Sequence, residues 1–150
     1  MAGKHLSLLV HFVWSTANRE PWITREWRDR LFGYIGGVLR HDNIKLIEAG
    51  GMDDHIHLYT SLPSTISIAK LVNSVKSNSS RWVHETFPNR RGFAWQKGYG
   101  AFSVSKSSEI QVLEYIKGQE SHHRKRTFTD EFLSLLEKHH VEYDERYLWD

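Results

Sequence analysis

Apolar and polar residues alternate along residues 5–14, HLSLLVHFVW, with the two-residue period of a β-strand. The apolar residues on one side of this predicted strand are Leu6, Leu8, Val10, Phe12 and Trp14. Residues 24–41 instead have apolar residues at helical spacing, and Thr24 is a candidate N-cap. The apolar residues of this predicted helix are Trp27, Leu31, Ile35 and Val38.

The following segments predict a β-hairpin and then four further elements. Residues 43–52 form a predicted strand that ends in a turn at Gly50–Gly51, and residues 54–62 form its partner. Ser67 can cap the next helix, which extends to about Glu85. A strand and two helices complete the chain at residues 93–105, 107–125 and 127–140, and Ser107 or Ser108 caps the first of these helices.

The order β-α-β-β-α-β-α-α begins with the six elements of the split βαβ, ferredoxin-like pattern. This pattern predicts an α+β protein with an antiparallel sheet and helices packed on one face. The other face of such a sheet is free, and an exposed site can be built there. No linker or internal repeat interrupts residues 1–150, so we expect a single domain.

Composition excludes several classes of chemistry. Hydrophobic residues make up 39% and charged residues 25% of the chain, as expected for a globular protein. The absence of cysteine excludes disulfides, thiolate metal sites and thiol catalysis. No apolar run is long enough to cross a membrane, and residues 1–15 lack a signal-peptide cleavage pattern. We therefore expect a cytoplasmic protein with no membrane partner.

Charge is distributed unevenly although the net charge is only +2. Residues 1–61 are neutral, residues 62–106 carry +6, and residues 107–150 carry −4. The basic block suits a polyanion, although a solvated basic face is an equally good explanation. Its candidate DNA-binding residues are Lys70, Lys76, Arg81, Arg90, Arg91 and Lys97. Trp95, Tyr99 and Phe102 could stack on bases, but we expect at least two of them to pack in the core.

His55 and His57 are separated by one residue within the predicted strand 54–62. Side chains at such positions point the same way, roughly 6.5–7 Å apart, so both histidines should face outward opposite Ile56 and Leu58. Two imidazoles at this spacing can converge on one metal ion. The alternative is two unrelated exposed histidines in a chain that contains 10 of them.

The neighbours of the histidine pair bear on its role. Asp53 and Asp54 precede the pair and could support the ligands or add to them. Histidine-triad nucleotide hydrolases use three alternating histidines, but Tyr59 stands at the third position here. The nucleophilic position of that class is therefore missing.

A second group of functional candidates lies on the predicted helix 107–125. The apolar seam of this helix is Val112, Leu113 and Ile116. At about 100° per residue, Tyr115 lies roughly 105° from the centre of the seam, and Gln119 and His122 fall on the same stripe. Tyr115 and Gln119 therefore share a polar face, although a half-exposed tyrosine at a helix–sheet boundary is the simpler explanation.

Together, HIH at residues 55–57 and YIKGQ at residues 115–119 resemble the motifs of HUH-type single-tyrosine transposases. The resemblance covers nearly the whole chain and includes GMDDHIH, FAWQKGYGAFSVS and EYIKGQESHHRK. It implies a ferredoxin-like fold, a homodimer and a divalent metal ion. Carried over by position, His55 and His57 are metal ligands, Gln119 is the third ligand and Tyr115 is the nucleophile.

The resemblance implies a DNA transposase that acts on single-stranded DNA with hairpins at element ends, with no small-molecule substrate. A tyrosine of this kind forms a 5′-phosphotyrosine, and a second 3′-OH then rejoins the strand. The neutral ligands predicted here would leave the full charge of Mg²⁺ or Mn²⁺ facing the phosphate. The family places the tyrosine helix on the partner subunit, and Gly98, Gly100 and Gly118 are candidate points of flexibility.

Two alternatives remain from the sequence. The first is an HUH replication-initiator or relaxase-like nickase, although such proteins usually carry more chain. The second is a non-catalytic ferredoxin-like module that binds nucleic acid through stacking aromatics on its open sheet face. We expect that face to present His55 and His57 instead.

Overall fold

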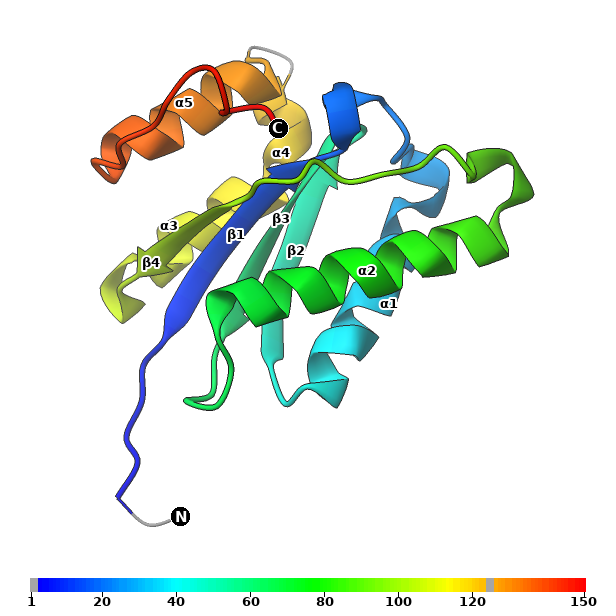
Figure 1. Cartoon of the computed structure of the whole chain (residues 1–150). Coiled ribbons are helices and arrows are strands. Elements are labelled where there is room, and N and C mark those ends of the chain that lie inside the picture. The colour runs from blue at the N-terminus through cyan, green and yellow to red at the C-terminus, as the bar shows by residue number, and fades with distance from the viewer. Residues whose placement is uncertain (1–2, 124–125) are drawn as a thin grey trace.

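The protein contains one four-stranded antiparallel sheet with strand order β2-β3-β1-β4 (Figure 1). The computed structural model describes residues 3–123 and 126–150. The strands are β1 Leu9–Ser15, β2 Lys45–Met52, β3 His55–Ser61 and β4 Gly100–Val104. The helices are α1 Arg25–His41, α2 Ile68–Thr86, α3 Glu109–Lys117, α4 Gln119–His123 and α5 Phe128–Lys138. Short 3-10 turns occur at η1 Ala17–Arg19, η2 Pro88–Arg90 and η3 Lys106–Ser108. This architecture confirms the predicted α+β class and the order of its first six elements.

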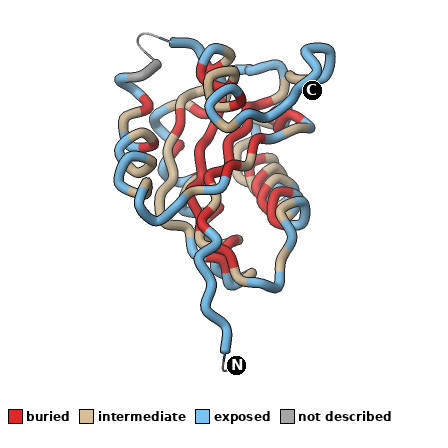
Figure 2. Tube along the Cα trace, turned by 90° about the vertical axis from the view of Figure 1, so that its left-hand side faces the viewer, coloured by how far each residue is buried: buried red, intermediate tan, exposed pale blue. Residues whose placement is uncertain are grey.

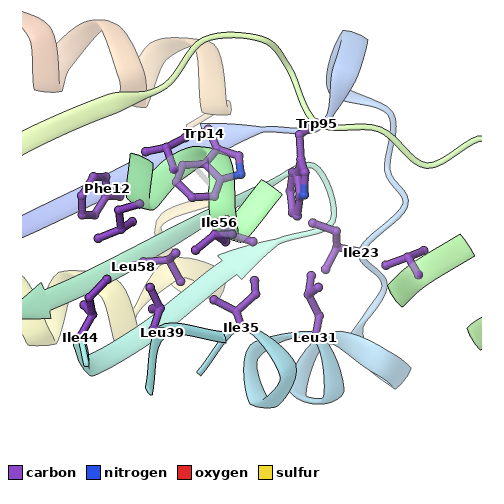
Figure 3. Packing of buried hydrophobic residues seen from close by; sticks show 14 of the residues in the cluster. Phe12, Trp14, Ile23, Leu31, Ile35, Leu39, Ile44, Ile56, Leu58 and Trp95 are labelled. Carbon is purple, nitrogen blue, oxygen red and sulfur yellow. The ribbon is translucent and has the colours of Figure 1, made fainter. Parts of the chain in front are cut away.

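Helices α1 and α2 cover one face of the sheet and form the main hydrophobic core (Figure 3). Phe12 and Trp14 of β1 and Ile56 and Leu58 of β3 point toward these helices and are fully buried. The helices contribute apolar residues from successive turns, including Leu31, Ile35, Leu39, Leu71 and Val75. Ser67 caps α2 as predicted, because its side chain accepts a hydrogen bond from the Lys70 backbone at 3.1 Å.

The second face of the sheet is covered as well, so the predicted open face is wrong. Tyr59 of β3 packs with Ile116 of α3, and Val13 of β1 packs with Phe128 and Phe132 of α5. Figure 1 shows α3, α4 and α5 on the side of the sheet opposite α1 and α2, and Figure 2 shows the strands buried between these layers. The apolar stripes of α3 and α5 need a surface to cover, and the second face provides it.

Three apolar residues predicted to face the core are exposed or only partly buried. Strand β1 begins only at Leu9, and the side chains of Leu6 and Leu8 are exposed. In α1, Val38 is only partly buried, and Leu39 takes its place in the core. Thr24 occupies the N-cap position of α1, but its side chain makes no capping hydrogen bond to the helix.

The turn of the β2–β3 hairpin lies at residues 53–54, and Gly50 and Gly51 lie within β2. The predicted Gly-Gly turn is therefore wrong. Both glycines are explained by close approach instead of by a turn. A Cβ on Gly50 would lie 2.4 Å from the carbonyl oxygen of Ile116, and one on Gly51 would lie 2.3 Å from that of His55. Gly50 thus lets the backbone of α3 contact the sheet.

The predicted helix 107–125 is divided at Gly118, which caps α3 before α4 begins at Gln119. Its last two residues, 124 and 125, lie outside the described residues. Strand β4 is shorter than predicted, and residues 93–99 contain only an isolated bridge between Trp95 and Thr16. Among residues 3–123 and 126–150, no helix combines the length and the apolar character needed to cross a bilayer.

Candidate metal and nucleophile site

His55 and His57 lie side by side on the second face of the sheet, as their spacing predicted. Both are fully buried, however, and not exposed, because α4 and α5 pack over them. His55 Nε2 lies 2.9 Å from Gln119 Oε1, and His57 Nε2 lies 2.9 Å from Glu131 Oε1. The structure thus brings Gln119 to the histidine pair across 64 residues of sequence.

Glu131 of α5 completes this cluster, and the sequence analysis missed it. One ligand atom from each of His55, His57 and Glu131 lies within 4.8 Å of the others. The Gln119 amide nitrogen donates to Glu131 Oε2 at 3.3 Å, so the amide lies against the same carboxylate. Two imidazoles, a carboxylate and an amide oxygen form a donor set that fits a divalent ion. The sequence predicted only neutral ligands, and the carboxylate of Glu131 adds a negative charge to this set.

Both histidines have a partner for the ring nitrogen that points away from Glu131. His55 Nδ1 lies 2.8 Å from Asp54 Oδ1, which is the supporting contact considered for this aspartate. His57 Nδ1 lies 2.8 Å from His11 Nε2, and the two rings stack at a centroid distance of 5.1 Å. His11 was also missed, although it shares the alternating face of β1 with Val13.

Charges in the buried cluster are balanced by neighbours. Burial disfavours a charged His55, but hydrogen bonds from its ring to Asp54 and Glu131 outweigh burial and raise its pKa to about 9. Burial and then the neighbouring His57 hold the pKa of His11 well below its usual value. In the absence of a metal ion, His55 is therefore an imidazolium between two carboxylates, and His11 is neutral.

Tyr115 lies at the edge of the cluster and is half-buried. Its ring meets the His57 ring edge-on at a centroid distance of 5.6 Å. Burial raises the pKa of the Tyr115 phenol, and the charge of Glu131 raises it further. Tyr115 in α3 and Gln119 in α4 are separated by the break at Gly118, but Gln119 Nε2 still donates to the Tyr115 carbonyl oxygen at 3.4 Å. The side chain of His122 lies outside the described residues. The tyrosine therefore lies against a histidine of its own chain, whereas the resemblance implied a tyrosine helix docked on the partner subunit.

A pocket of about 700 Å³ opens beside Tyr115, between β4, α3 and α5. His11 and Glu131 form part of its wall next to the histidine cluster. Arg126 and Lys138 bring positive charge to the same pocket. Arg126 is fixed by hydrogen bonds to the Asp130 carbonyl and to Ser134. The pocket is thus a basic recess that leads to the tyrosine.

The predicted DNA-binding residues do not surround this pocket. Lys70, Arg81, Arg91 and Lys97 are exposed, but they belong to α2 and the segment after it. Helix α2 packs on the face of the sheet opposite the histidines. None of the four lines the pocket, and they are called the basic surface below.

Two members of the predicted set are engaged within the fold. Lys76 donates to the carbonyl oxygens of Gln96, Lys97 and Gly98 at 2.7 to 3.2 Å, and burial lowers its pKa to about 8. Arg90 pairs with Glu26 at 3.1 Å and lies over the rings of Trp27 and Phe87. Both side chains hold the connection between α2 and β4 in place.

The three candidate stacking aromatics divide as expected. Trp95 and Phe102 are buried in the two cores, and the side chain of Tyr99 remains 38% exposed. Tyr99 lies beside Lys76, whose ammonium is 5.8 Å from the centre of its ring. Of the three, Tyr99 has the ring face most available to a base.

Helix α4 is tied to the opposite layer by ion pairs at the end of the sheet. Arg28 of α1 pairs with Asp53 in the hairpin turn and reaches Glu120 of α4 at 3.7 Å. Arg25 also pairs with Glu120, at 2.9 Å. Asp53 thus anchors the turn that precedes the histidines, and Glu120, which follows Gln119, ties α4 to α1.

Comparison with known proteins places the fold and the motifs in one family. The family described as transposase IS200 like matches residues 4–119, which include both histidines, Tyr115 and Gln119. The chain therefore belongs to the IS200-like transposase family. Helix α5 and its Glu131 lie beyond the matched residues.

Individual relatives agree with this assignment. The chain is 25% identical over 122 residues to the ISDra2 transposase TnpA of Deinococcus radiodurans, a match covering 78% of this chain and 87% of the relative. It is 26% identical over 124 residues to the transposase for insertion sequence element IS200 of Salmonella typhimurium, a match covering 74% and 81% of the two chains.

Solved structures show the same fold. A crystal structure described as a putative transposase from Deinococcus radiodurans superposes with a TM-score of 0.66 at 24% identity, covering 79% of this chain and 95% of that one. A REP-associated tyrosine transposase bound to a REP hairpin superposes with a TM-score of 0.61 at 15% identity, covering 82% and 74%.

Proposed function

We propose that this transposase cuts and rejoins single-stranded DNA through a covalent bond between Tyr115 and a 5′-phosphate. One observation carries the proposal: the Tyr115 ring lies against His57, within a cluster of two histidines, an amide and a carboxylate. Membership of the transposase family supports DNA as the substrate of this cluster. A tyrosine nucleophile conserves the energy of the phosphodiester bond, so no nucleotide cofactor is needed.

Tyr115 supplies the reacting atom. Its phenolic oxygen forms a bond to phosphorus and loses its proton, while the bond from phosphorus to the 3′-oxygen breaks and leaves a 3′-OH. A second 3′-OH reverses the exchange and restores the phenol. Burial and Glu131 both oppose the phenolate in the absence of a cation, because they raise the pKa of Tyr115. The chain alone should therefore be inactive.

His55, His57, Gln119 and Glu131 would hold a divalent cation in this proposal. Imidazole nitrogens with carboxylate and amide oxygens suit Mn²⁺, whereas Mg²⁺ prefers oxygen ligands and serves mainly through its abundance in cells. When bound, the ion would offset negative charge on the scissile phosphate. It would also offset the charge of Glu131 beside Tyr115.

The basic pocket supports a path for the DNA strand. Arg126 and Lys138 line the recess that leads to Tyr115, and they suit the phosphates on either side of the scissile bond. None of the residues of the basic surface lines this recess. We propose that this surface, including Lys70, Arg81 and Arg91, contacts paired DNA such as a hairpin stem. The structure of the REP-associated tyrosine transposase was determined with a bound REP hairpin.

The homodimer implied by the family resemblance stays a prediction. Tyr115 lies against His57 of its own chain, which supports a site assembled within one chain. Of the alternatives, a non-catalytic module would need stacking aromatics on an open sheet face. That face is covered by α3, α4 and α5, which disfavours such a module.

The proposal is tested by trapping the covalent bond. Single-stranded oligonucleotides copied from both flanks of the gene, each able to form a hairpin, are incubated with the protein and Mn²⁺ or Mg²⁺. We expect an adduct that survives denaturing electrophoresis, and mass spectrometry should place the nucleotide on Tyr115. Tyr115→Phe should abolish the adduct while oligonucleotide binding is kept.

Tyr99→Phe is the matched control, because Tyr99 is exposed and lies outside the histidine cluster. It should form the adduct at the wild-type level. An adduct that persists in Tyr115→Phe, or that maps to another tyrosine, would remove Tyr115 from its proposed role.

A further inference from the structure

One face of α3 lines the pocket beside Tyr115. The residues that it contributes, with its N-cap included, are Ser108, Gln111, Val112 and Tyr115. They recur three and four residues apart, so they follow one another along one side of the helix. The candidate nucleophile is the last of these residues, and the pocket extends along the helix from Tyr115 toward the N-terminus of α3.

Helix α5 lines another side of the pocket with residues at the same spacing. The residues from α5 are Glu131, Ser134, Leu135 and Lys138. Phe102 of β4 packs with residues of α5, and Val104 of β4 packs with residues of α3. Strand β4 thus contacts both helices, and it gives the pocket an apolar surface between two helix faces that carry hydroxyl, amide and ammonium groups.

The charges around this pocket suit a phosphate group. Arg126 and Lys138 line it, and among its described lining residues the only acid is Glu131, which is held by His57. The volume of about 700 Å³ lies within the roughly 300–1,000 Å³ of small-molecule sites. A nucleotide within a DNA strand combines a flat, largely apolar base with a phosphate on either side. Its chemistry therefore matches this combination of apolar surface and positive charge.

Two further side chains of the pocket can recognise a base. The His139 ring stacks on Phe102 at a centroid distance of 4.6 Å, and a ring held in this way offers a surface on which a base can stack. The side-chain amide of Gln111 makes no hydrogen bond to another described residue, and it offers both a donor and an acceptor to a base edge. Gln111 lies one helical turn before Tyr115, so the two side chains can contact neighbouring groups of one strand.

We propose that this pocket holds one nucleotide beside the scissile phosphate, and that Gln111 determines which base is accepted. The inference rests on the proposed function in one respect, since the bound strand is the one that Tyr115 would cut. In this arrangement the base stacks on His139, while Arg126 and Lys138 contact the adjoining phosphates. Gln111 contacts the edge of the base and is a specificity-determining residue with no part in bond cleavage.

Occupancy of the pocket can be measured by NMR without any cleavage. The chain contains three glutamines, so ¹H–¹⁵N spectra show few side-chain amides of this type, and Gln111→Ala identifies the signal of Gln111. Tyr115→Phe protein is titrated with four trinucleotides that place adenine, cytosine, guanine or thymine between two thymidines. We expect the Gln111 signal to shift on binding and one of the four to bind most tightly. A Gln111 signal that no trinucleotide shifts at saturation would overturn the proposal.

Base preference in the covalent assay tests the role of Gln111 directly. The oligonucleotide is varied at the two nucleotides that flank the scissile phosphate. At one of them we expect wild type to favour the best base over the worst by roughly 5–150-fold, the range of one bidentate contact. Gln111→Ala should reduce this ratio to below about threefold and leave the rate on the worst base unchanged. Glu114→Ala, an exposed position of α3 outside the pocket, should keep the wild-type preference. The same preference in wild type and Gln111→Ala would overturn the proposal.

His139 variants test the stacking surface. His139→Ala should weaken binding of all four trinucleotides by a similar factor, roughly 5–150-fold, whereas His139→Phe should keep the wild-type affinity. Unchanged affinity in His139→Ala would contradict the proposed position of the base. A protein whose Gln111 signal responds to trinucleotides but which forms no adduct would refute the proposed function and leave the pocket standing. An adduct with no response at Gln111 would refute the pocket alone.

Discussion

Glu131 is the residue on which the charge of the site depends. It accepts hydrogen bonds from His57 and Gln119, lies 3.4 Å from His55 Nε2, and raises the pKa of Tyr115. A carboxylate that is 3% exposed is costly to keep without cationic partners. His55 provides one such partner in the metal-free protein, and a divalent cation would provide a stronger one.

Glu131→Gln should therefore weaken metal binding, since it keeps the shape of the side chain and removes its charge. We expect the Mn²⁺ affinity measured by calorimetry to fall by at least the roughly 10–100-fold typical of losing a residue that only supports a ligand. The matched control is Glu137→Gln, an exposed position on the same helix, which should bind Mn²⁺ as wild type does. Unchanged affinity in Glu131→Gln would exclude Glu131 from the ligand set.

The sequence predicted His55, His57, Tyr115 and Gln119 because the members of each pair are at most four residues apart, where local spacing largely determines the face. It did not predict His11 or Glu131, whose contacts are set by how β1 and α5 pack. A signal for Glu131 was present in the sequence of α5. This carboxylate falls within the helical stripe of Phe128, Phe132 and Leu136, where an unpaired charge would be unfavourable.

At the scale of elements, the position of α3 on the sheet determines where Tyr115 lies. The backbone of α3 lies close to Gly50 of β2, where even a methyl group would meet the Ile116 carbonyl oxygen at 2.4 Å. Ile116 directly follows Tyr115 in α3. A side chain at residue 50 must therefore push the tyrosine away from the histidines or strain β2.

Gly50→Ala should reduce adduct formation by more than tenfold and lower the free energy of unfolding by about 1–3 kcal/mol, as is typical of overpacking. Chemical denaturation and the covalent assay measure these two effects. Gly37→Ala is the control, because nothing lies within 4 Å of a Cβ at this helical position. It should leave activity unchanged and stabilise by roughly 0.5–1 kcal/mol. A fully active Gly50→Ala would show that α3 does not dock closely when the enzyme acts.

The periodicity of apolar residues predicted the helices and strands, but it did not predict which face of the sheet each helix covers. Alternation and helical spacing identified all four strands, with boundary errors at Leu9 and in residues 93–99. The ferredoxin-like pattern correctly placed α1 and α2 on one face. It contains no rule for helices that follow the fourth strand, so the covering of the second face by α3, α4 and α5 could not be predicted from it.

At the scale of the whole molecule, Tyr115, the two histidines, Gln119 and Glu131 lie together within one chain. Mixing His57→Ala with Tyr115→Phe tests this arrangement, because each variant lacks one essential group. We expect the mixture to form no adduct, since neither chain has both Tyr115 and His57. Tyr115→Phe mixed with wild type should keep the activity of the wild-type fraction. Activity in confirmed heterodimers of the two variants would instead show that α3 exchanges between chains.

Strand β3 serves both faces of the sheet, with Ile56 and Leu58 on one side and His55 and His57 on the other. A slip of one residue in its pairing would exchange these sets, placing imidazoles in the hydrophobic core and aliphatic side chains in the site. The pairing register of β3 that builds the hydrophobic core is thus also the register that brings the candidate metal ligands together. A copy of the chain with β3 paired one residue out of register would therefore lose its hydrophobic core and its candidate site together.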